Sequence, residues 1–107
     1  MKTRYTLATA LDLDGHQEDA LTELRTVLRA RPDYADARYL RGKILLAAGD
    51  AAGAAIELEI AARLGPEDAN VHYQLGQAYQ KLGKTDLAQE QFQAYQRLKD
   101  QRRKGSR

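Results

Sequence analysis

The chain has 107 residues and a net charge of +2, with 43% hydrophobic and 30% charged residues, which is typical of one soluble globular domain. The absence of cysteine excludes disulfides, thiol catalysis and zinc–thiolate sites, and it agrees with a cytoplasmic location. No apolar run approaches the roughly 18 residues of a membrane span, and acids interrupt the basic N-terminal stretch before a signal-peptide core develops.

The first unit of the chain predicts a pair of helices, at 2–14 and 17–31. The turn between them belongs to the stretch GHQEDALTEL at 15–24, which has close counterparts further along the chain. Pro32 closes the unit, because proline cannot continue a helix and suits the turn between units. The unit is therefore predicted to be a helix–turn–helix hairpin.

The second unit repeats this arrangement, with predicted helices at 35–48 and 52–64 and with Pro66 at its end. Its turn lies in GDAAGAAIEL at 49–58. Gly53 stands near the start of the fourth helix, where glycine lowers helix stability by up to about 1 kcal/mol relative to alanine. The second hairpin is predicted in spite of this residue.

Arg41 departs from the pattern of the other units. It occupies the position at which they have Leu7 and Leu75. An unpaired buried guanidinium is costly, so we expect Arg41 either to reach the edge of the stack or to pair with Glu57 or Glu59.

The third unit predicts helices at 69–82 and 86–103, because its apolar residues recur at helical spacing. The two apolar stripes consist of Leu75, Ala78, Tyr79 and Leu82, and of Leu87, Ala88, Phe92, Tyr95 and Leu98. Between them lies GKTD, in which Gly83 can adopt the positive φ that ends a helix and Thr85 or Asp86 can cap the next one.

Small residues recur every 34 positions, which is the length of a helix–turn–helix repeat. The recurring sets are Gly15, Gly49 and Gly83; Ala20, Ala54 and Ala88; and Ala8, Gly42 and Gly76. Small side chains let paired helices approach closely. The sequence predicts an all-α, right-handed α-solenoid of three repeats with six antiparallel helices. One domain covers residues 1–102, as repeats 1–34, 35–68 and 69–102, and a basic C-terminal tail follows at 103–107.

The third unit, YQLGQAYQKLGKTDLAQEQF, resembles the tetratricopeptide repeat (TPR). It carries Leu75-Gly76, Tyr79, Gly83, Ala88 and Phe92 at the positions of that family's signature, and the resemblance extends over residues 1–102. The resemblance implies a non-catalytic protein–protein interaction scaffold. It also implies that a partner peptide lies on the concave side, which the first helix of each repeat lines.

The predicted peptide-binding groove consists of residues that share a face of these first helices. They are Tyr5, Thr9, Asp12, Tyr39, Lys43, Leu46, Tyr73, Gln77 and Gln80. The three tyrosines are again 34 residues apart. Tyrosine is frequent in binding surfaces, but these rings can equally pack neighbouring first helices together, and both interpretations stay open.

One TPR subclass binds the acidic C-terminal tail of a heat-shock chaperone through a carboxylate clamp of lysine, asparagine and arginine. The matching residues here are Tyr5, Thr9, Leu40, Asn70 and Gln74. Since none of the five is basic, the clamp is predicted to be absent, and an acidic chaperone tail is not an expected partner.

The last helix carries glutamines at positions where the first two repeats place several apolar residues. Gln89 and Gln96 correspond to Leu21 and Leu28 of the first repeat, and Gln93 stands near them. A polar outer face is typical of the terminal repeat of a solenoid. The stack is predicted to end here, although self-association through an end or through the tyrosine-lined face remains an alternative.

The C-terminal segment is strongly basic: residues 97–107 carry +5, which leaves −3 for the remainder of the chain. Its cations are Arg97, Lys99, Arg102, Arg103, Lys104 and Arg107. They offer an alternative function, contact with nucleic acid or an anionic surface. Cations also simply favour a helix C-terminus. No aromatic residue interleaves with them, so a nucleic acid is not an expected partner.

No pattern in the sequence predicts catalysis, a cofactor or a metal site. His16 lies in a turn, and packing explains His72. The stretch DLDG at 12–15 resembles part of a calcium loop, but Ala10 and Leu21 would occupy two of its ligand positions. No phosphate-binding loop is present. We therefore predict a cytoplasmic, non-catalytic scaffold that binds a peptide or protein segment in its concave groove.

Overall fold

The computed structural model describes residues 2–13 and 15–105, which form six helices. The helices are α1 (Lys2–Leu13), α2 (Gln17–Ala30), α3 (Ala35–Ala47), α4 (Ala51–Leu64), α5 (Ala69–Lys81) and α6 (Thr85–Gly105). The described residues contain no strand. Every helix begins and ends within two residues of its predicted bounds, so the prediction of six helices is confirmed.

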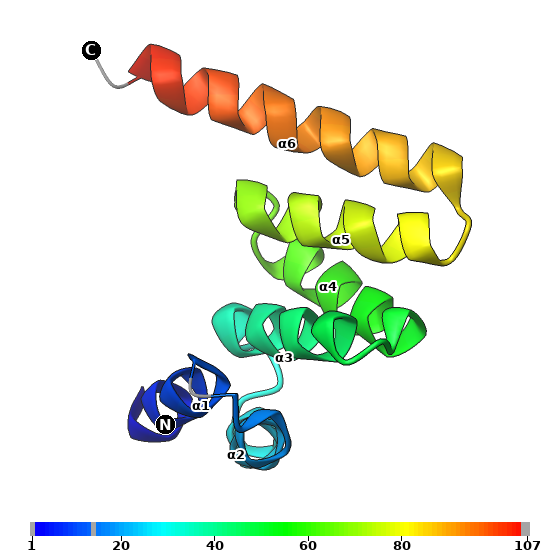
Figure 1. The fold of residues 1–107 in the computed structure, drawn as a ribbon. Helices are drawn as coiled ribbons and strands as arrows, with labels where there is room; N and C mark the ends of the chain where they lie inside the picture. The colour runs from blue at the N-terminus through cyan, green and yellow to red at the C-terminus, as the bar shows by residue number, and fades with distance from the viewer. Residues whose placement is uncertain (1, 14, 106–107) are drawn as a thin grey trace.

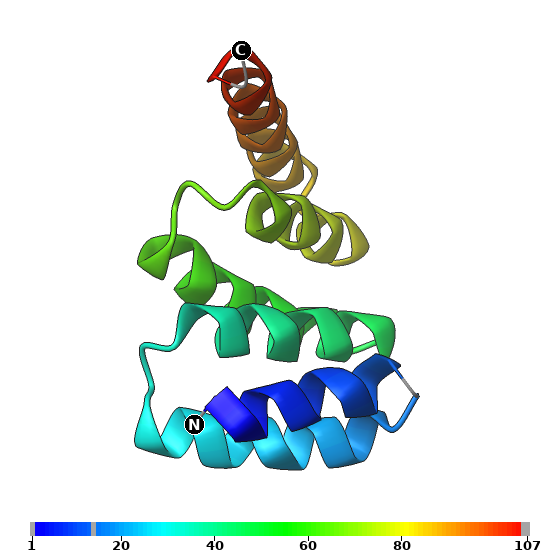
Figure 2. The same ribbon diagram turned by 90° about the vertical axis from the view of Figure 1, so that its left-hand side faces the viewer.

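The helices form three antiparallel hairpins that stack from one end of the molecule to the other (Figure 1). The hairpin of α1 and α2 lies at one end and that of α5 and α6 at the other, so the start of α1 and the end of α6 are far apart (Figure 2). Contacts are most extensive within each hairpin. Between hairpins, α4 packs on α5 more extensively than α2 packs on α3.

Each hairpin turns at a glycine with a positive φ. The angles are 83° at Gly15, 94° at Gly49 and 78° at Gly83, and the described residues contain no other positive φ. In this conformation an L side chain is disfavoured by roughly 1–2 kcal/mol, whereas glycine is not. The prediction for Gly83 is confirmed, and the same explanation covers its two counterparts.

The paired helices approach closely at glycines, as the small-residue pattern predicts. A Cβ atom on Gly42 would lie 2.6 Å from Cγ of Leu58, and one on Gly76 would lie 2.7 Å from Cε1 of Phe92. Neither distance is tolerable for a real Cβ atom. These glycines therefore set the separation of α3 from α4 and of α5 from α6.

The core is divided into two hydrophobic clusters. The first joins α1 and α2 to α3, and consists of Ala8, Ala20, Leu24, Val27, Leu28, Ala37, Leu40 and Ile44. The second joins α3 and α4 to α5 and α6, and consists of Leu46, Ala54, Ala55, Leu58, Leu75, Ala78, Tyr79 and Ala88. Since α3 contributes to both clusters, it connects the two halves of the solenoid.

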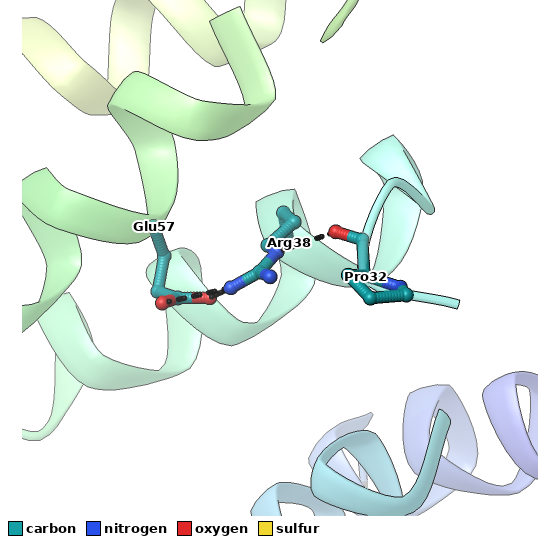
Figure 3. Close-up of polar contacts among 3 residues, drawn as sticks. All are labelled: Pro32, Arg38 and Glu57. Carbon is teal, nitrogen blue, oxygen red and sulfur yellow. Dashed lines mark hydrogen bonds and ion pairs between the residues drawn. The ribbon is translucent and has the colours of Figure 1, made fainter. Parts of the chain in front are cut away.

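Arg38 connects both helices of the second hairpin to the end of the first (Figure 3). Its Nη1 donates to both carboxylate oxygens of Glu57 on α4, at 3.1 and 3.3 Å, and its Nε donates to the carbonyl oxygen of Pro32 at 3.0 Å. We call the contact between these two side chains, Arg38 and Glu57, a latch. It explains the burial of Glu57, which is 8% exposed.

A similar contact recurs in the other two hairpins. His72 Nε2 lies 2.8 Å from the carbonyl oxygen of Pro66, to which it donates, and its Nδ1 lies 2.7 Å from Oε1 of Gln91 on α6. Arg4 donates to Glu23 at 3.0 Å. In all three hairpins the two side-chain partners are 19 residues apart. Their first members, Arg4, Arg38 and His72, follow one another at 34 residues, so the latch repeats with the period of the fold.

The predicted pairing of Arg41 with Glu57 or Glu59 is wrong. Glu57 accepts hydrogen bonds from Arg38, and Glu59 accepts one from the hydroxyl of Tyr79. Arg41 is half-buried, and its Nε is buried without a hydrogen-bond partner among the described residues. The two carboxylates are bonded instead by Arg38, three residues before Arg41 on α3, and by Tyr79 on α5.

The last helix is longer than its counterparts. α6 has 21 residues and continues to Gly105, whereas α2 and α4 have 14 each. Asp100 stands where the earlier repeats have Pro32 and Pro66, and without proline nothing interrupts the helix at this point. The final turns of α6 project beyond α5 (Figure 1).

Candidate functional site

The odd-numbered helices form a continuous inner layer of the solenoid. Within the described residues, α1 contacts α3 and α3 contacts α5, whereas α2 and α4 make no such contact with each other and neither do α4 and α6. Helices that lie closer together mark the inside of a curve. The concave surface is therefore the one formed by α1, α3 and α5.

A pocket of about 390 Å³ opens between α3 and α5. Its lining residues are Lys43, Leu46, Ala47, Gln74, Gln77, Gln80 and Lys81. The structure thus brings together four of the predicted groove residues, namely Lys43, Leu46, Gln77 and Gln80. That they bind a peptide stays a prediction.

The lining of this pocket combines an apolar base with amides and two cations. Leu46 is only 6% exposed because it also belongs to the second hydrophobic cluster. Lys43 on α3 and Lys81 on α5 are both exposed, and no acid of the part of the chain that the structure describes lines the pocket. Gln77 donates from Nε2 to the hydroxyl of Tyr73 at 3.1 Å, which fixes one of the amides.

Two of the three groove tyrosines pack into the protein. Tyr5 lies against the first hydrophobic cluster, with its ring 5.4 Å from that of Tyr34, and Tyr39 lies against the second cluster. Burial raises the pKa of both, and the charge of Asp36 near Tyr5 and of Asp68 near Tyr39 adds to this effect. Tyr5 and Tyr39 therefore pack against the core, as one of the two interpretations of the tyrosines expects.

The third tyrosine lies in an open aromatic cluster. Tyr73 is 38% exposed, and its ring lies 6.0 Å from Phe92 and 5.0 Å from Tyr95. The ammonium of Lys99 lies 5.1 Å above the ring of Tyr95, in the range of a cation–π interaction. Sequence reasoning missed this cluster. A bulky Tyr95 at the position of Ala61 in the preceding repeat was the available signal.

The remaining groove residues of the first repeat lie outside the pocket. Thr9 donates from Oγ1 to the carbonyl oxygen of Tyr5 at 3.0 Å, within its own helix. Asp12 is half-buried near the end of α1. The predicted groove therefore divides into a first-repeat part without a pocket and a part between α3 and α5 with one.

The basic residues of the C-terminal segment lie on α6 as far as the structure describes them. Arg97, Arg102 and Arg103 are exposed, and Arg103 lies 3.7 Å from a carboxylate oxygen of Asp100. Two of the predicted cations are not covered: the Lys104 side chain and Arg107 lie outside the described residues. Lys99 contacts Tyr95, so one aromatic ring does lie beside these cations, which the sequence pattern had not indicated.

The three glutamines of α6 are exposed, as a polar outer face requires. Gln89, Gln93 and Gln96 all face solvent. Their counterparts in the earlier repeats include the buried residues Leu28 and Ala55. The difference arises because no further helix covers α6 in the part of the chain that the structure describes.

Neither a metal centre nor a membrane span emerges from the described residues. No three histidine, aspartate or glutamate side chains among residues 2–13 and 15–105 lie close enough together to hold a metal ion. His16 is exposed beside a second, shallow pocket in the turn before α2, and His72 belongs to the third latch. None of the helices that the structure describes combines the length and apolarity of a membrane span.

Comparison with known sequences identifies the repeat. Two profiles of the tetratricopeptide repeat match residues 5–69 and 69–102. No curated protein sequence matches the chain.

Solved structures resemble the whole fold. A crystal structure of MamA is 22% identical, with a TM-score of 0.89 over 96% of this chain, which spans 60% of that chain. The first and second TPR of Spaghetti (RPAP3), both bound to HSP90 peptide SRMEEVD, are 16% and 19% identical. Their TM-scores are 0.86 and 0.87 over 90% of this chain, and 76% and 89% of those chains are covered. At these identities the likeness establishes the fold, and it confirms the predicted TPR-like solenoid.

Proposed function

The chain belongs to the tetratricopeptide repeat family, and we propose that it is a non-catalytic scaffold that binds a peptide or protein segment on its concave surface. Fold alone does not decide a function. The observation that carries the proposal is the pocket between α3 and α5, which combines an apolar base with polar groups that can orient a ligand.

The RPAP3 structures support peptide binding in general terms, since each is of a TPR bound to a peptide. We do not expect the present chain to bind the same peptide tightly. The five clamp positions, Tyr5, Thr9, Leu40, Asn70 and Gln74, carry no cation, and Leu40 is buried in the core. Titration calorimetry with SRMEEVD should give no micromolar complex. A micromolar affinity would show that other residues hold the terminal carboxylate.

Filling the pocket tests the proposal directly. Ala47 is exposed and lines the pocket, so Ala47→Trp should occupy it without disturbing the core. Ala52→Trp places the same ring at an exposed position of α4, away from the pocket. Short random peptides displayed on phage should be selected by the unmodified chain and by Ala52→Trp, but not by Ala47→Trp. Equal selection by all three would exclude the pocket as the binding site.

Lys99 and Tyr95 favour one alternative, an adaptor for nucleic acid or an anionic surface on α6. Their contact places an aromatic ring beside a cation, and single-stranded nucleic acids bind to surfaces that combine aromatic rings with positive charge. Fluorescence anisotropy with a single-stranded oligonucleotide should then show binding that falls steeply with salt. If the oligonucleotide does not bind even at low salt, this alternative is excluded.

A further inference from the structure

We propose that the pocket between α3 and α5 selects a carboxylate side chain, from an aspartate or glutamate within the bound segment. This inference rests on the proposed function, because it names what the concave surface recognises. It concerns side-chain carboxylates and not a terminal carboxylate. Of the five clamp positions, only Gln74 lines the pocket.

The charge of the pocket is the first argument. Among the described residues, only Lys43 and Lys81 bring a charge to its lining, and neither lies within ion-pairing distance of a described carboxylate. Two cations at one pocket attract an anion and repel a lysine or arginine of a ligand. The pocket therefore favours acidic ligand side chains and also disfavours basic ones. Asp12, the one acid among the predicted groove residues, lies outside the lining.

The chemistry of the remaining lining fits the same ligand. The amides of Gln74, Gln77 and Gln80 can donate hydrogen bonds to carboxylate oxygens. Leu46 and Ala47 provide an apolar surface for the methylene groups of an acidic side chain. The volume of about 390 Å³ leaves room for such a side chain together with water.

Helix dipoles explain only part of this arrangement. Lys81 ends α5, where a cation favours the helix C-terminus without any ligand. Lys43 lies outside the last turn of α3, so the same explanation does not apply to it. The C-termini of α3 and α5 lie near the pocket, and their partial negative charge disfavours an anion. The full positive charges of Lys43 and Lys81 outweigh this partial charge.

The test uses a phage library of short random peptides fused through their C-termini, so that only side-chain carboxylates can be selected. Libraries are selected on the full chain, on Lys43→Gln/Lys81→Gln and on Lys84→Gln. Lys84 is exposed in the turn after α5, outside the pocket lining, and its substitution controls for the loss of a positive charge elsewhere on the surface.

Peptides selected on the unmodified chain and on Lys84→Gln should be enriched in Asp or Glu, and those selected on the double variant should not. A selected peptide should bind the double variant about tenfold more weakly, and its Glu→Gln version should lose affinity for the unmodified chain by a similar factor. The two losses should not add, because they remove the same interaction.

Two other results would overturn the proposal, and they have different meanings. Selected peptides without acidic enrichment, excluded by Ala47→Trp, would refute carboxylate selection and leave groove binding intact. Failure to select any peptide, or binding that Ala47→Trp does not affect, would refute the proposed function together with the inference. Circular dichroism of each variant establishes that it is folded.

Discussion

The latch residues illustrate how single side chains hold each hairpin together. The side chains of Arg38 and Glu57 are only 18% and 11% exposed, whereas those of Arg4 and Glu23 are 52% and 24% exposed. Breaking a buried ion pair leaves an uncompensated charge, but exposed pairs contribute little. The same contact therefore has different consequences in the first and second repeats.

Arg38→Ala should lower the free energy of unfolding by about 2–3 kcal/mol, since it leaves the Glu57 carboxylate buried without its partner. Arg4→Ala, the matched change in the first repeat, should cost less than about 1 kcal/mol. Urea unfolding followed by circular dichroism measures both. Equal losses in the two variants would contradict the role given to burial.

Tyr79 makes the stability sensitive to alkaline pH. Burial, together with the hydrogen bond to Glu59 and its negative charge, raises the pKa of the Tyr79 hydroxyl. Because the raised pKa belongs to the folded state, the contribution of the Tyr79 hydroxyl to the free energy of unfolding is complete below about pH 10, where an unfolded tyrosine ionises. It is lost as the pH rises above that value.

Tyr79→Phe should therefore lower the free energy of unfolding by about 1–2 kcal/mol at neutral pH. The difference from the unmodified chain should shrink above about pH 10 in thermal unfolding, and a constant difference would contradict this account.

At the scale of the helices and turns, the glycine turns set where each hairpin reverses. Gly49→Ala should cost about 1–2 kcal/mol because of its φ of 94°, although no atom within 4 Å would obstruct the methyl group. Gly65 follows the last residue of α4 with a φ of −141°, and a Cβ atom added to it would lie 3.9 Å from its nearest neighbour, the carbonyl oxygen of Ala61. Gly65→Ala should therefore change the free energy of unfolding by less than about 0.5 kcal/mol. Thermal unfolding compares the two, and a similar cost for both would show that backbone conformation is not the cause.

The helices could be predicted from sequence because their signals are local. The glycine turns, Pro32 and Pro66 mark hairpin boundaries within a few residues of chain. The partner of Glu57 could not be predicted, since Arg38 and Arg41 are less than one turn apart and only the rotation of α3 decides between them. The partner of Glu59 depends on how α5 packs against α4, because it is Tyr79. The cluster of Tyr73 and Tyr95 depends likewise on how α5 packs against α6. The pocket also depends on how the helices pack, here α3 against α5. Four of its lining residues were nevertheless among the predicted groove residues.

At the scale of the whole molecule, the exposed glutamines of α6 predict the oligomeric state. A fourth hairpin or a second copy stacked on α6 would bury Gln89 and Gln96, where amides would lose water without assured partners. Light scattering with size-exclusion chromatography should therefore give a 12.0 kDa monomer over a concentration series. A larger species at high concentration would mean that an end or the concave surface is already occupied by another copy.

The sparse contact between α2 and α3 has a mechanical consequence. The first hairpin joins the others through the hydrophobic cluster that it shares with α3, where α2 packs on α3 less extensively than α4 packs on α5 between the second and third hairpins. Under tension between the chain ends, we expect the first hairpin to detach at this junction before the others separate. The pocket belongs to α3 and α5, so it would survive that first step. The N-terminal hairpin would then act as a compliant segment in series with a stiffer binding unit.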